Sequence, residues 1–362
     1  MDDATIAAYE AGAVRWRDRK PARFLDRVDV FRLALGDRGG TVADLGCGAG
    51  LHLPLLPRPA LALDAALAML ELVPEVAPDA LRVRGDLEHL PIRRGALSGA
   101  WARASYLHVP STSLPWSLME LHHALAVDGI AHLTMLRGSG DGPDPDDEHP
   151  GRLFARWEPD TLTDQIAGAG FDVLEVVVDR SEDDWLHALV RRARTLPDVV
   201  GPGMRLLLCG LNPSLHSADA GVGFARPGNR FWPAALASGL LTADRDGRDA
   251  YVSHGVGMTD LVKRATARAE ELSVDEYRAG AARVERLVRW LRPRAICFVG
   301  LGGYRAAVDR RAQAGVQAES FGGVPAYVMP NPSGLNAHTT PADLAEHLRA
   351  AARMADDRGV DG

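Results

Sequence analysis

The chain has 362 residues, of which 46% are hydrophobic and 25% are charged. This composition is ordinary for a globular protein and excludes a mainly disordered, collagen-like or coiled-coil molecule. At roughly 100–200 residues per domain, the length predicts two domains. No run of ~18 apolar residues is present, so we expect no membrane span. The first residues, MDDATIAAYE, lack the basic flank and apolar run of a secretory signal.

The formal net charge of −7 is divided unevenly along the chain. Residues 1–198 hold 21 Lys and Arg against 31 Asp and Glu, a net of −10, and residues 199–362 hold 20 against 17, a net of +3. A mildly positive half beside an acidic half fits a domain that faces nucleic acid next to one that does not.

The cysteines Cys47, Cys209 and Cys297 lie far apart and form no CxxC pair. Neither a zinc ribbon nor a disulfide framework is therefore expected, and we assign no metal ligands. A reducing, cytoplasmic compartment is the natural expectation for such a chain.

In the first half, short apolar runs predict strands in the order TVADLG, LALD, LRVRGD, AWARAS and IAHLTML. A Gly-, Pro- and Asp-rich stretch at residues 138–150 follows, and then a helix-like segment at 159–169 and a strand-like one at 171–179. These last two segments would complete a sheet begun upstream. We therefore interpret the acidic stretch as a surface loop and place the junction at LPDVVGPG, which gives domains 1–198 and 199–362.

The second half shows the same alternation, with strand-like runs MRLLLCG, RAICFVG and AYVMP. Ser273 and Glu276 have the spacing of a capping box before an amphipathic helix, and Thr340 precedes Pro341 as the N-cap of the last helix. Strands that alternate with helices predict an α/β protein. We expect two doubly wound α/β/α domains whose parallel sheets are covered on both faces.

The run VADLGCGAG is a strand followed by a glycine-rich turn. Gly46, Gly48 and Gly50 allow a sharp turn and a close approach of the backbone to a ligand. The pattern is GxGxG rather than the full dinucleotide fingerprint, and a turn without a ligand is the plain alternative.

Acidic residues stand near the ends of successive predicted strands, which strengthens the interpretation of this turn. Asp64 is placed to accept hydrogen bonds from ribose hydroxyls, Asp86 to meet an adenine edge, and Asp44 to face a ligand amine. Ribose, adenine and positive charge together describe S-adenosylmethionine better than a pyrophosphate.

The order DLGCGAG, LDAALAML, GDLEHLP and SYLHVP resembles class I S-adenosylmethionine-dependent methyltransferases over roughly residues 35–180. The resemblance implies a Rossmann-like fold with S-adenosylmethionine as cofactor. ALSGAW stands where many relatives carry a Phe-Asp pair. The methyl acceptor is not readable, because the motifs of amino-directed and carbon-5 DNA methyltransferases are absent. By resemblance, the cofactor site would be lined by Gly46, Gly48, Asp64, Asp86 and Leu87.

Two strand-like runs in the second half break into similar turns. The first gives Gly210-Leu211-Asn212-Pro213-Ser214, and the second gives Asn331-Pro332-Ser333-Gly334-Leu335. Ligands of open parallel sheets bind outside the carboxyl ends of the strands, so both asparagines should lie across one cleft. A single Asn-Pro dipeptide is an ordinary turn. Between the two breaks, GFARPGNRFW offers Phe224 as a stacking face and Asn229-Arg230 as polar supports.

From about Gly203 to the last helix, the chain resembles the mismatch-specific uracil-DNA glycosylases, the Mug and thymine-DNA glycosylase branch. The motifs are GLNPSL, SADAGVGFARPGNRFW, GMTDLVKRAT and VMPNPSGL. The resemblance implies an α/β/α fold that flips a base from double-stranded DNA. It also implies hydrolysis of the N-glycosidic bond of uracil, or of related lesions, at G·U or G·T mispairs, without a cofactor.

The resemblance also implies a role for each residue that stands at a matching position of the family's motifs. Asn212 would orient the attacking water, Phe224 would stack on the flipped base, Asn331 would hydrogen-bond it, and Leu335 would fill the vacated stack. Backbone N–H groups of the turn from Asn212 to Leu215 could point at the base oxygen. The sequence departs from the family's pattern at Asn336-Ala337, which replace Ser-Arg, and at Asp260, where a relative carries lysine. The remaining residues expected around the base are Gly210, Ser214, Ser217, Ser333 and Gly334.

The sequence leaves other functions open. The main activity could be methyl transfer to a small molecule or nucleobase, with the second domain as a non-catalytic DNA-binding module. The second domain could also bind a mispair without cutting, or take thymine or etheno adducts in place of uracil. Neither the oligomeric state nor the reason for the fusion follows from the sequence.

Overall fold

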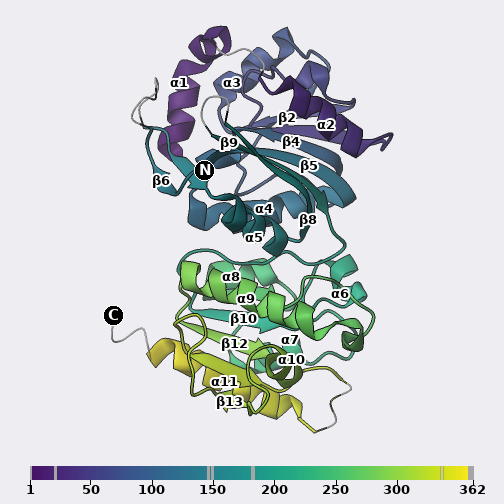
Figure 1. Ribbon diagram of the computed structural model, residues 1–362, viewed down its shortest axis with the longest axis vertical. Helices are drawn as coiled ribbons and strands as arrows, with labels where there is room; N and C mark the ends of the chain where they lie inside the picture. Colours follow the sequence, from purple (N-terminus) through teal and green to yellow (C-terminus); the bar gives the residue numbers. More distant parts are fainter. Residues whose placement is uncertain are drawn as a thin grey trace. The chain divides into compact units, whose positions relative to one another are not determined.

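A computed structural model describes residues 2–19, 23–144, 147, 151–180, 184–334, 336 and 338–357. The chain divides into two compact units, Met1–Ala193 and Arg194–Gly362. This division falls a few residues before the junction expected from the sequence at 198. Figure 1 shows an α/β ribbon in each unit.

The N-terminal unit is built on a sheet whose main strands run in the order β3-β2-β1-β4-β5-β9-β8. β1, β2, β3, β4 and β5 are parallel, whereas β9 is antiparallel to both of its neighbours. A small hairpin, β6 and β7, joins the end of β5. The strands are β1 Thr41–Leu45, β2 Ala60–Asp64, β3 Leu81–Arg84, β4 Leu97–Arg103, β5 Leu125–Arg137, β6 Gly140–Gly142, β7 Phe154–Trp157, β8 Phe171–Asp179 and β9 Trp185–Arg192.

The expectation of a purely parallel sheet is wrong for β9. β8 and β9 are consecutive strands with a short connection, and only antiparallel strands can be joined without a crossover. The stretch at residues 138–150, expected to be a surface loop, contains β6; residues 145, 146 and 148–150 lie outside the described residues.

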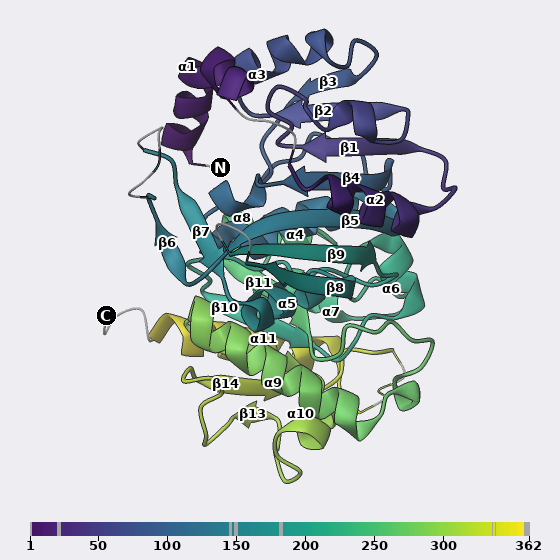
Figure 2. The same cartoon turned by 45° about the horizontal axis from the view of Figure 1, so that its top comes forward.

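Helices cover the N-terminal sheet, which confirms the doubly wound fold class. α2 buries Val28, Phe31 and Leu35 against sheet residues that include Val42 and Trp101. In Figure 2, α4 and α5 lie on the other side of this sheet from α2. The helices are α1 Asp3–Arg19, α2 Leu25–Leu35, α3 Leu67–Leu72, α4 Leu114–Ala124 and α5 Pro159–Gly168.

The C-terminal unit has a five-stranded sheet in the order β11-β10-β12-β14-β13. The first four strands are parallel, and β13 is a two-residue antiparallel edge. The strands are β10 Leu206–Gly210, β11 Val256–Asp260, β12 Ala295–Val299, β13 Gly315–Val316 and β14 Ala326–Met329. The helices are α6 Leu215–Ala220, α7 Phe231–Ser238, α8 Gly247–His254, α9 Val274–Leu291, α10 Leu301–Ala307 and α11 Pro341–Asp357.

Alternating residues of β10 divide between two cores, one on each face of the sheet. Leu206 and Leu208 pack with α7 and α11, and Leu207 and Cys209 pack with α9. This is the pattern of a parallel strand buried on both faces. The capping box predicted for α9 is present, because Ser273 and Glu276 each accept a hydrogen bond from the other's backbone N–H.

Candidate functional site

Both asparagine-bearing turns of the C-terminal unit lie at the same edge of its sheet. Cys209 of β10 pairs with Phe298 of β12, which pairs with Val328 of β14. Asn212 lies three residues after Cys209, and Asn331 lies three residues after Val328. β12 lies between the two strands that precede these asparagines. At a strand spacing of ~4.8 Å, the segments that follow β10 and β14 leave the sheet roughly 10 Å apart. The strand order and register therefore bring together two segments that are far apart in the sequence.

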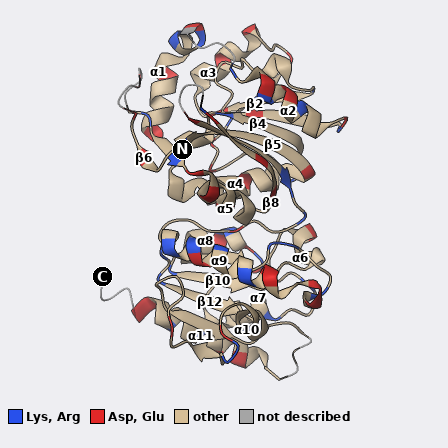
Figure 3. Ribbon diagram, viewed as in Figure 1, with Lys and Arg blue, Asp and Glu red and all other residues tan. Residues whose placement is uncertain are grey.

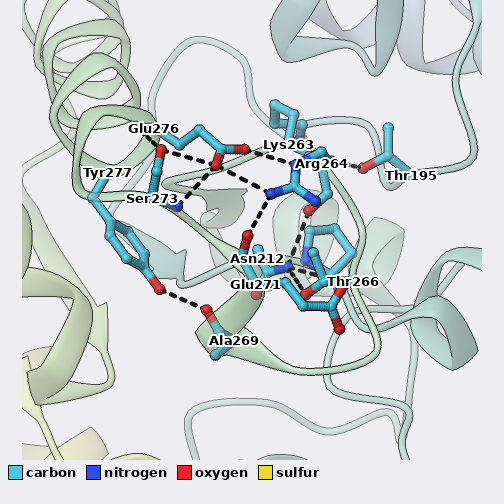
Figure 4. A network of polar contacts seen from close by, with 11 residues as sticks. Thr195, Asn212, Lys263, Arg264, Thr266, Ala269, Glu271, Ser273, Glu276 and Tyr277 are labelled. Atoms are coloured by element: carbon cyan, nitrogen blue, oxygen red, sulfur yellow. Dashed lines mark hydrogen bonds and ion pairs between the residues drawn. The ribbon is translucent and has the colours of Figure 1, made fainter.

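The side-chain amide of Asn212 is held in one orientation. Its Nδ2 donates hydrogen bonds to the Thr266 Oγ1 at 2.8 Å and to the Arg264 carbonyl at 3.0 Å, with a longer contact to the Pro213 carbonyl at 3.2 Å (Figure 4). A carbonyl oxygen can only accept, so the nitrogen of the amide must face Arg264. The Asn212 Oδ1 consequently points away from these acceptors and can accept a hydrogen bond from water.

The loop that holds Asn212 is itself anchored to the start of α9. The Arg264 guanidinium donates to both carboxylate oxygens of Glu276, at 2.7 and 3.1 Å, and to the Glu271 carbonyl at 2.8 Å. Hydrogen bonds from Arg264 and Ser273 lower the pKa of the partly exposed Glu276 to about 2. Figure 4 shows this chain of contacts running from Ser273 through Glu276 to Asn212. The sequence analysis identified the capping box and missed its link to the asparagine.

Phe224 lies at this edge beside the end of β10. Its ring stacks on Phe231 with centroids 4.1 Å apart, and a Cβ at Gly210 would lie 3.4 Å from its Cζ atom. The backbone at Phe224 is left-handed, with φ of 57°, which is uncommon for a bulky residue and is typically retained at functional sites. The buried Ser217 Oγ accepts a hydrogen bond from the Ala225 N–H at 3.2 Å and so fixes the chain just after the ring.

Ser214 has a structural position. It caps the short helix α6, and its hydroxyl accepts a hydrogen bond from the Ser217 N–H and donates one to the Ser217 Oγ, both at 3.1 Å. The Leu215 N–H donates to the Thr266 carbonyl at 3.2 Å. The expectation that Leu215 offers its N–H to a base is therefore wrong, since that donor already has an acceptor.

The second turn is braced by the segment that carries Phe224. Asn331 Oδ1 accepts the Ser333 N–H at 2.9 Å, which leaves its Nδ2 as the donor that can reach a ligand. The Arg230 guanidinium donates to the carbonyls of Ser333, Asn336 and Thr339. A Cβ at Gly334 would lie 2.7 Å from the Gly228 carbonyl oxygen, so this crossing of the two loops requires glycine. Leu335, expected to fill the vacated stack, lies outside the described residues.

Asp260, noted only as a departure from the family's pattern, is part of this edge. It ends β11 and pairs in register with Gly210. A Cβ at Gly210 would overlap its Oδ1 atom, so the carboxylate lies directly over that glycine. Burial raises the pKa of Asp260 to about 6, against the attraction of Lys263 and Arg283.

In the N-terminal unit, the glycine-rich turn follows β1 as expected. Gly46, Gly48 and Gly50 all have positive φ. The Asp64 carboxylate accepts hydrogen bonds from the Gly48 N–H at 2.8 Å and from the Ala66 N–H at 2.9 Å, and thereby ties the end of β2 to the turn. A Cβ at Gly48 would be in ordinary contact with the Trp16 indole at 3.9 Å and with the Met69 thioether at 4.0 Å.

The expected acidic residues have different surroundings. Asp44 is buried, and burial together with the neighbouring Asp64 carboxylate raises its pKa to about 8. Burial raises the pKa of Asp64 to about 6 against its backbone hydrogen bonds. Asp86 accepts the Glu88 N–H at 2.9 Å. Leu87 is 1% exposed and packs in the interior, so its side chain does not face a ligand.

The sequence analysis missed the contribution of α1 to this region. Tyr9 and Trp16, with Ala13 between them, have the spacing of one helix face, and Trp16 lies beside Gly48. The Tyr9 hydroxyl contacts His108 Nε2 at 2.8 Å and accepts from the Arg152 guanidinium at 2.7 Å. Burial raises the pKa of Tyr9 to about 12. The apolar spacing within α1 was the one signal for these residues.

Comparison with known proteins agrees with the geometry of the C-terminal unit. The sheet has helices on both faces and asparagine-bearing turns at the carboxyl ends of its strands, which defines an α/β/α domain. Residues 197–353 match the family model described as the Uracil DNA glycosylase superfamily. The C-terminal unit is therefore a domain of that superfamily.

The N-terminal region is similar in fold to S-adenosylmethionine-dependent methyltransferases. One from Mesorhizobium loti is 18% identical, with 45% of this chain and 96% of that chain covered and a TM-score of 0.38. The 1,6-didemethyltoxoflavin-N1-methyltransferase of Burkholderia thailandensis is 19% identical, with 52% of this chain and 85% of that chain covered and a TM-score of 0.42. A methyltransferase from Clostridium acetobutylicum is 14% identical, with 52% of this chain and 97% of that chain covered and a TM-score of 0.41.

The described part of the chain contains neither a membrane-spanning helix nor a group of metal-ligating side chains. None of its helices combines the length and the apolar character needed to cross a membrane. Within the same residues, no three His, Cys, Asp or Glu side chains are grouped so that they could hold a metal ion.

Proposed function

We propose that the C-terminal unit is a DNA glycosylase of the Mug and thymine-DNA glycosylase branch. It hydrolyses the N-glycosidic bond of uracil, or of a related lesion, at G·U or G·T mispairs in double-stranded DNA. The observation that carries this proposal is the Asn212 amide, whose nitrogen is fixed by Thr266 and Arg264 so that its oxygen is left to accept a hydrogen bond from water. A water held there is positioned to attack the sugar carbon of a nucleotide at this edge of the sheet.

The reaction passes through an oxocarbenium-like sugar as the pyrimidine leaves as an anion. It needs a positioned water, donors to the departing base and room for an extrahelical nucleotide. In this proposal Phe224 stacks on the flipped base, and the Asn331 Nδ2 donates to it. Leu335 fills the gap in the duplex, as apolar wedges do in other DNA-binding proteins.

In the C-terminal unit, the positive charge that supports a DNA partner lies on two loops and not along a helix. Figure 3 shows Lys and Arg interspersed with Asp and Glu along α9, so this helix presents no continuous basic stripe. Arg226 and Arg268 are exposed and lie on loops next to the asparagine-bearing turns. We propose that they contact phosphates, which positions the duplex and makes binding salt-dependent.

The test is release of free uracil from a duplex with one G·U mispair. Wild type is expected to release uracil and leave an abasic site, and Asn212→Ala is expected to lose at least 100-fold in rate, the usual size of a lost positioning group. Gln313→Ala, which removes an exposed amide of the same unit, is the control. Unchanged release by Asn212→Ala would contradict the role of this asparagine. A panel of duplexes with uracil, thymine or an etheno adduct fixes the lesion preference.

For the N-terminal unit we propose S-adenosylmethionine as the cofactor. The residues fit this molecule, because the Gly48 turn has positive φ, lies beside the apolar side chains of Trp16 and Met69, and is bonded to the Asp64 carboxylate. When bound, the cofactor supplies an electrophilic methyl group. Asp64 would accept from the ribose hydroxyls, and Asp44 would face the cationic part of the ligand, which favours its charged form.

The test of this second site is calorimetric binding of S-adenosylmethionine to the full chain. Saturable binding to wild type is expected, with at least a tenfold loss in Asp64→Ala and none in Asp79→Ala, an exposed carboxylate of the same unit. Absence of binding to wild type would contradict the proposal.

A methyltransferase with a non-catalytic C-terminal module is the alternative function. It predicts mispair binding without base release. A cytoplasmic location stays a prediction from the sequence.

A further inference from the structure

Arg103 is the last residue of β4 in the N-terminal unit and lies close to the glycine-rich turn. Trp101, two residues earlier on β4, pairs in register with Asp44 of β1. Residues two apart on a strand share a face, so the side chains of Arg103 and Asp44 lie on the same face of the sheet. Just after Arg103, the chain packs against the turn, because a Cβ at Gly46 would overlap the Cβ of Ser105. Arg103 therefore stands beside the turn that is expected to hold the cofactor.

The guanidinium of Arg103 has no counter-ion in the described part of the chain. Its Nε atom is buried without a hydrogen-bond partner, and its two terminal nitrogens, which are not buried, make no hydrogen bond or ion pair either. Burial lowers the pKa of Arg103, and the positive charge of Arg23 lowers it further. Burial raises the pKa of Asp44 to about 8, so without a ligand this carboxyl group is mostly neutral at pH 7. Because charges taken out of water are normally paired in proteins, Arg103 is a cation that lacks its anion.

The side chain of Arg103 leans away from the strands that carry the expected ribose and adenine contacts. Its guanidinium carbon lies 5.5 Å from the centroid of the Phe24 ring. That ring packs against His187 and Trp185 of β9, with centroids 4.7 and 5.6 Å apart. β9 lies two strands beyond β4 in the sheet, whereas β1, β2 and β3 lie on the other side of β4 (Figure 2). The positive charge is thus directed to the side of the expected cofactor site on which a second substrate has room to bind.

The surroundings of the Arg103 guanidinium are ordered by the fold. Arg103 pairs in register with Thr134 of β5, which pairs with His187 of β9, so the three side chains form one row on one face. Burial lowers the pKa of His187 to about 4, which leaves its imidazole neutral at pH 7. The backbone at Phe24 is left-handed, with φ of 60°, a conformation that bulky residues rarely adopt. A fork of charged donors therefore lies beside an apolar ring and a neutral imidazole, which suits a ligand with a flat apolar part and an anionic end.

We propose that Arg103 binds the carboxylate of the methyl acceptor, and that the acceptor of the N-terminal unit is therefore a small organic acid. This inference rests on the S-adenosylmethionine site proposed above. A planar guanidinium presents its N–H donors in a fork that matches the two oxygens of a carboxylate, and such charge-assisted pairs are stronger than hydrogen bonds between neutral groups. Phosphates, in contrast, are commonly held by several backbone N–H groups at a helix N-terminus.

A residue kept for a ligand need not stabilise the free protein, and this gives a first test. Arg103→Met keeps an apolar stem against Phe24 and removes the charge. Because the wild-type charge is partly desolvated and unpaired, the variant is expected to unfold in urea at the same midpoint as wild type or at a higher one. A lower midpoint would show that Arg103 serves the fold, and it would overturn the proposal.

The second test is calorimetric titration of the full chain, saturated with S-adenosylhomocysteine, with acetate, benzoate and indole-3-acetate and with the amide of each. Wild type is expected to bind at least one of these carboxylates about tenfold more tightly than its amide, the size of one charge-assisted contact. Arg103→Met is expected to lose this preference, and Arg103→Lys, which keeps the charge without the planar fork, to retain part of it. Arg82→Met, which removes an exposed arginine of β3, is expected to match wild type.

The outcomes separate this inference from the proposed cofactor site. If wild type binds S-adenosylhomocysteine but prefers no carboxylate over its amide, or if Arg103→Met keeps the preference, the role of Arg103 is overturned and the cofactor site remains. If Arg103→Met instead weakens the binding of S-adenosylhomocysteine itself, the anion is the carboxylate of the cofactor, and the assignment to the acceptor is overturned. If wild type binds no S-adenosylhomocysteine, the proposed cofactor site fails, and the acceptor role of Arg103 fails with it.

Discussion

The hydrogen bond between Asn212 Nδ2 and Thr266 Oγ1 gives the most direct test of the proposed site. Thr266→Val replaces the hydroxyl by a methyl group of nearly the same size at a residue that is 4% exposed. The backbone contacts of Thr266 are retained, because its N–H donates to Pro213 and its carbonyl accepts from Leu215. The change therefore removes one acceptor from the asparagine and little else.

The magnitude follows from the remaining contacts. A buried neutral hydrogen bond contributes about 1 kcal/mol, and the Arg264 carbonyl at 3.0 Å still holds the amide nitrogen. If the lost energy served to orient Asn212, the rate of base release falls about fivefold. Binding of the mispaired duplex should be unchanged, because Thr266 is buried and does not face DNA.

The assay is single-turnover release of uracil by wild type, Thr266→Val and Thr266→Ser, together with the affinity of each for the duplex. Thr266→Ser keeps the acceptor, so its rate should lie within twofold of wild type. Equal rates for Thr266→Val and wild type would refute the argument that the Asn212 amide must be held. A loss confined to affinity would refute it too.

Two predictions concern stability. A Cβ at Gly280 of α9 would overlap the Leu261 carbonyl, whereas one at Gly302 of α10 meets nothing within 4 Å. Urea unfolding should therefore show Gly280→Ala destabilised by about 1–3 kcal/mol and Gly302→Ala unchanged or stabilised by up to about 1 kcal/mol; equal effects would contradict the packing. His132 is buried against Trp101, with ring centroids 4.4 Å apart, and burial lowers its pKa to about 3. Because the unfolded chain binds the proton first, wild type loses stability as the pH falls below about 6.5. Relative to wild type, His132→Phe should gain up to about 1.4 kcal/mol per pH unit between pH 6 and pH 4, and a gain independent of pH would exclude His132 as the cause.

The sequence by itself determined the elements whose signals are local. The α/β class, the strands that precede Asn212 and Asn331, and the capping box at Ser273 follow from periodicity and from residues a few positions apart. The shared edge of the two asparagines also followed, because parallel strands end on the same side of a sheet.

Contacts between distant segments were decided only by the tertiary structure. The acceptors of Asn212 come from residues 264 and 266, and Asp260 meets Gly210 across two neighbouring strands. In the N-terminal unit, α1 meets the glycine turn, and β9 turns back against β5. Such contacts depend on strand register and on side-chain packing between segments far apart in the chain, and no local pattern encodes either.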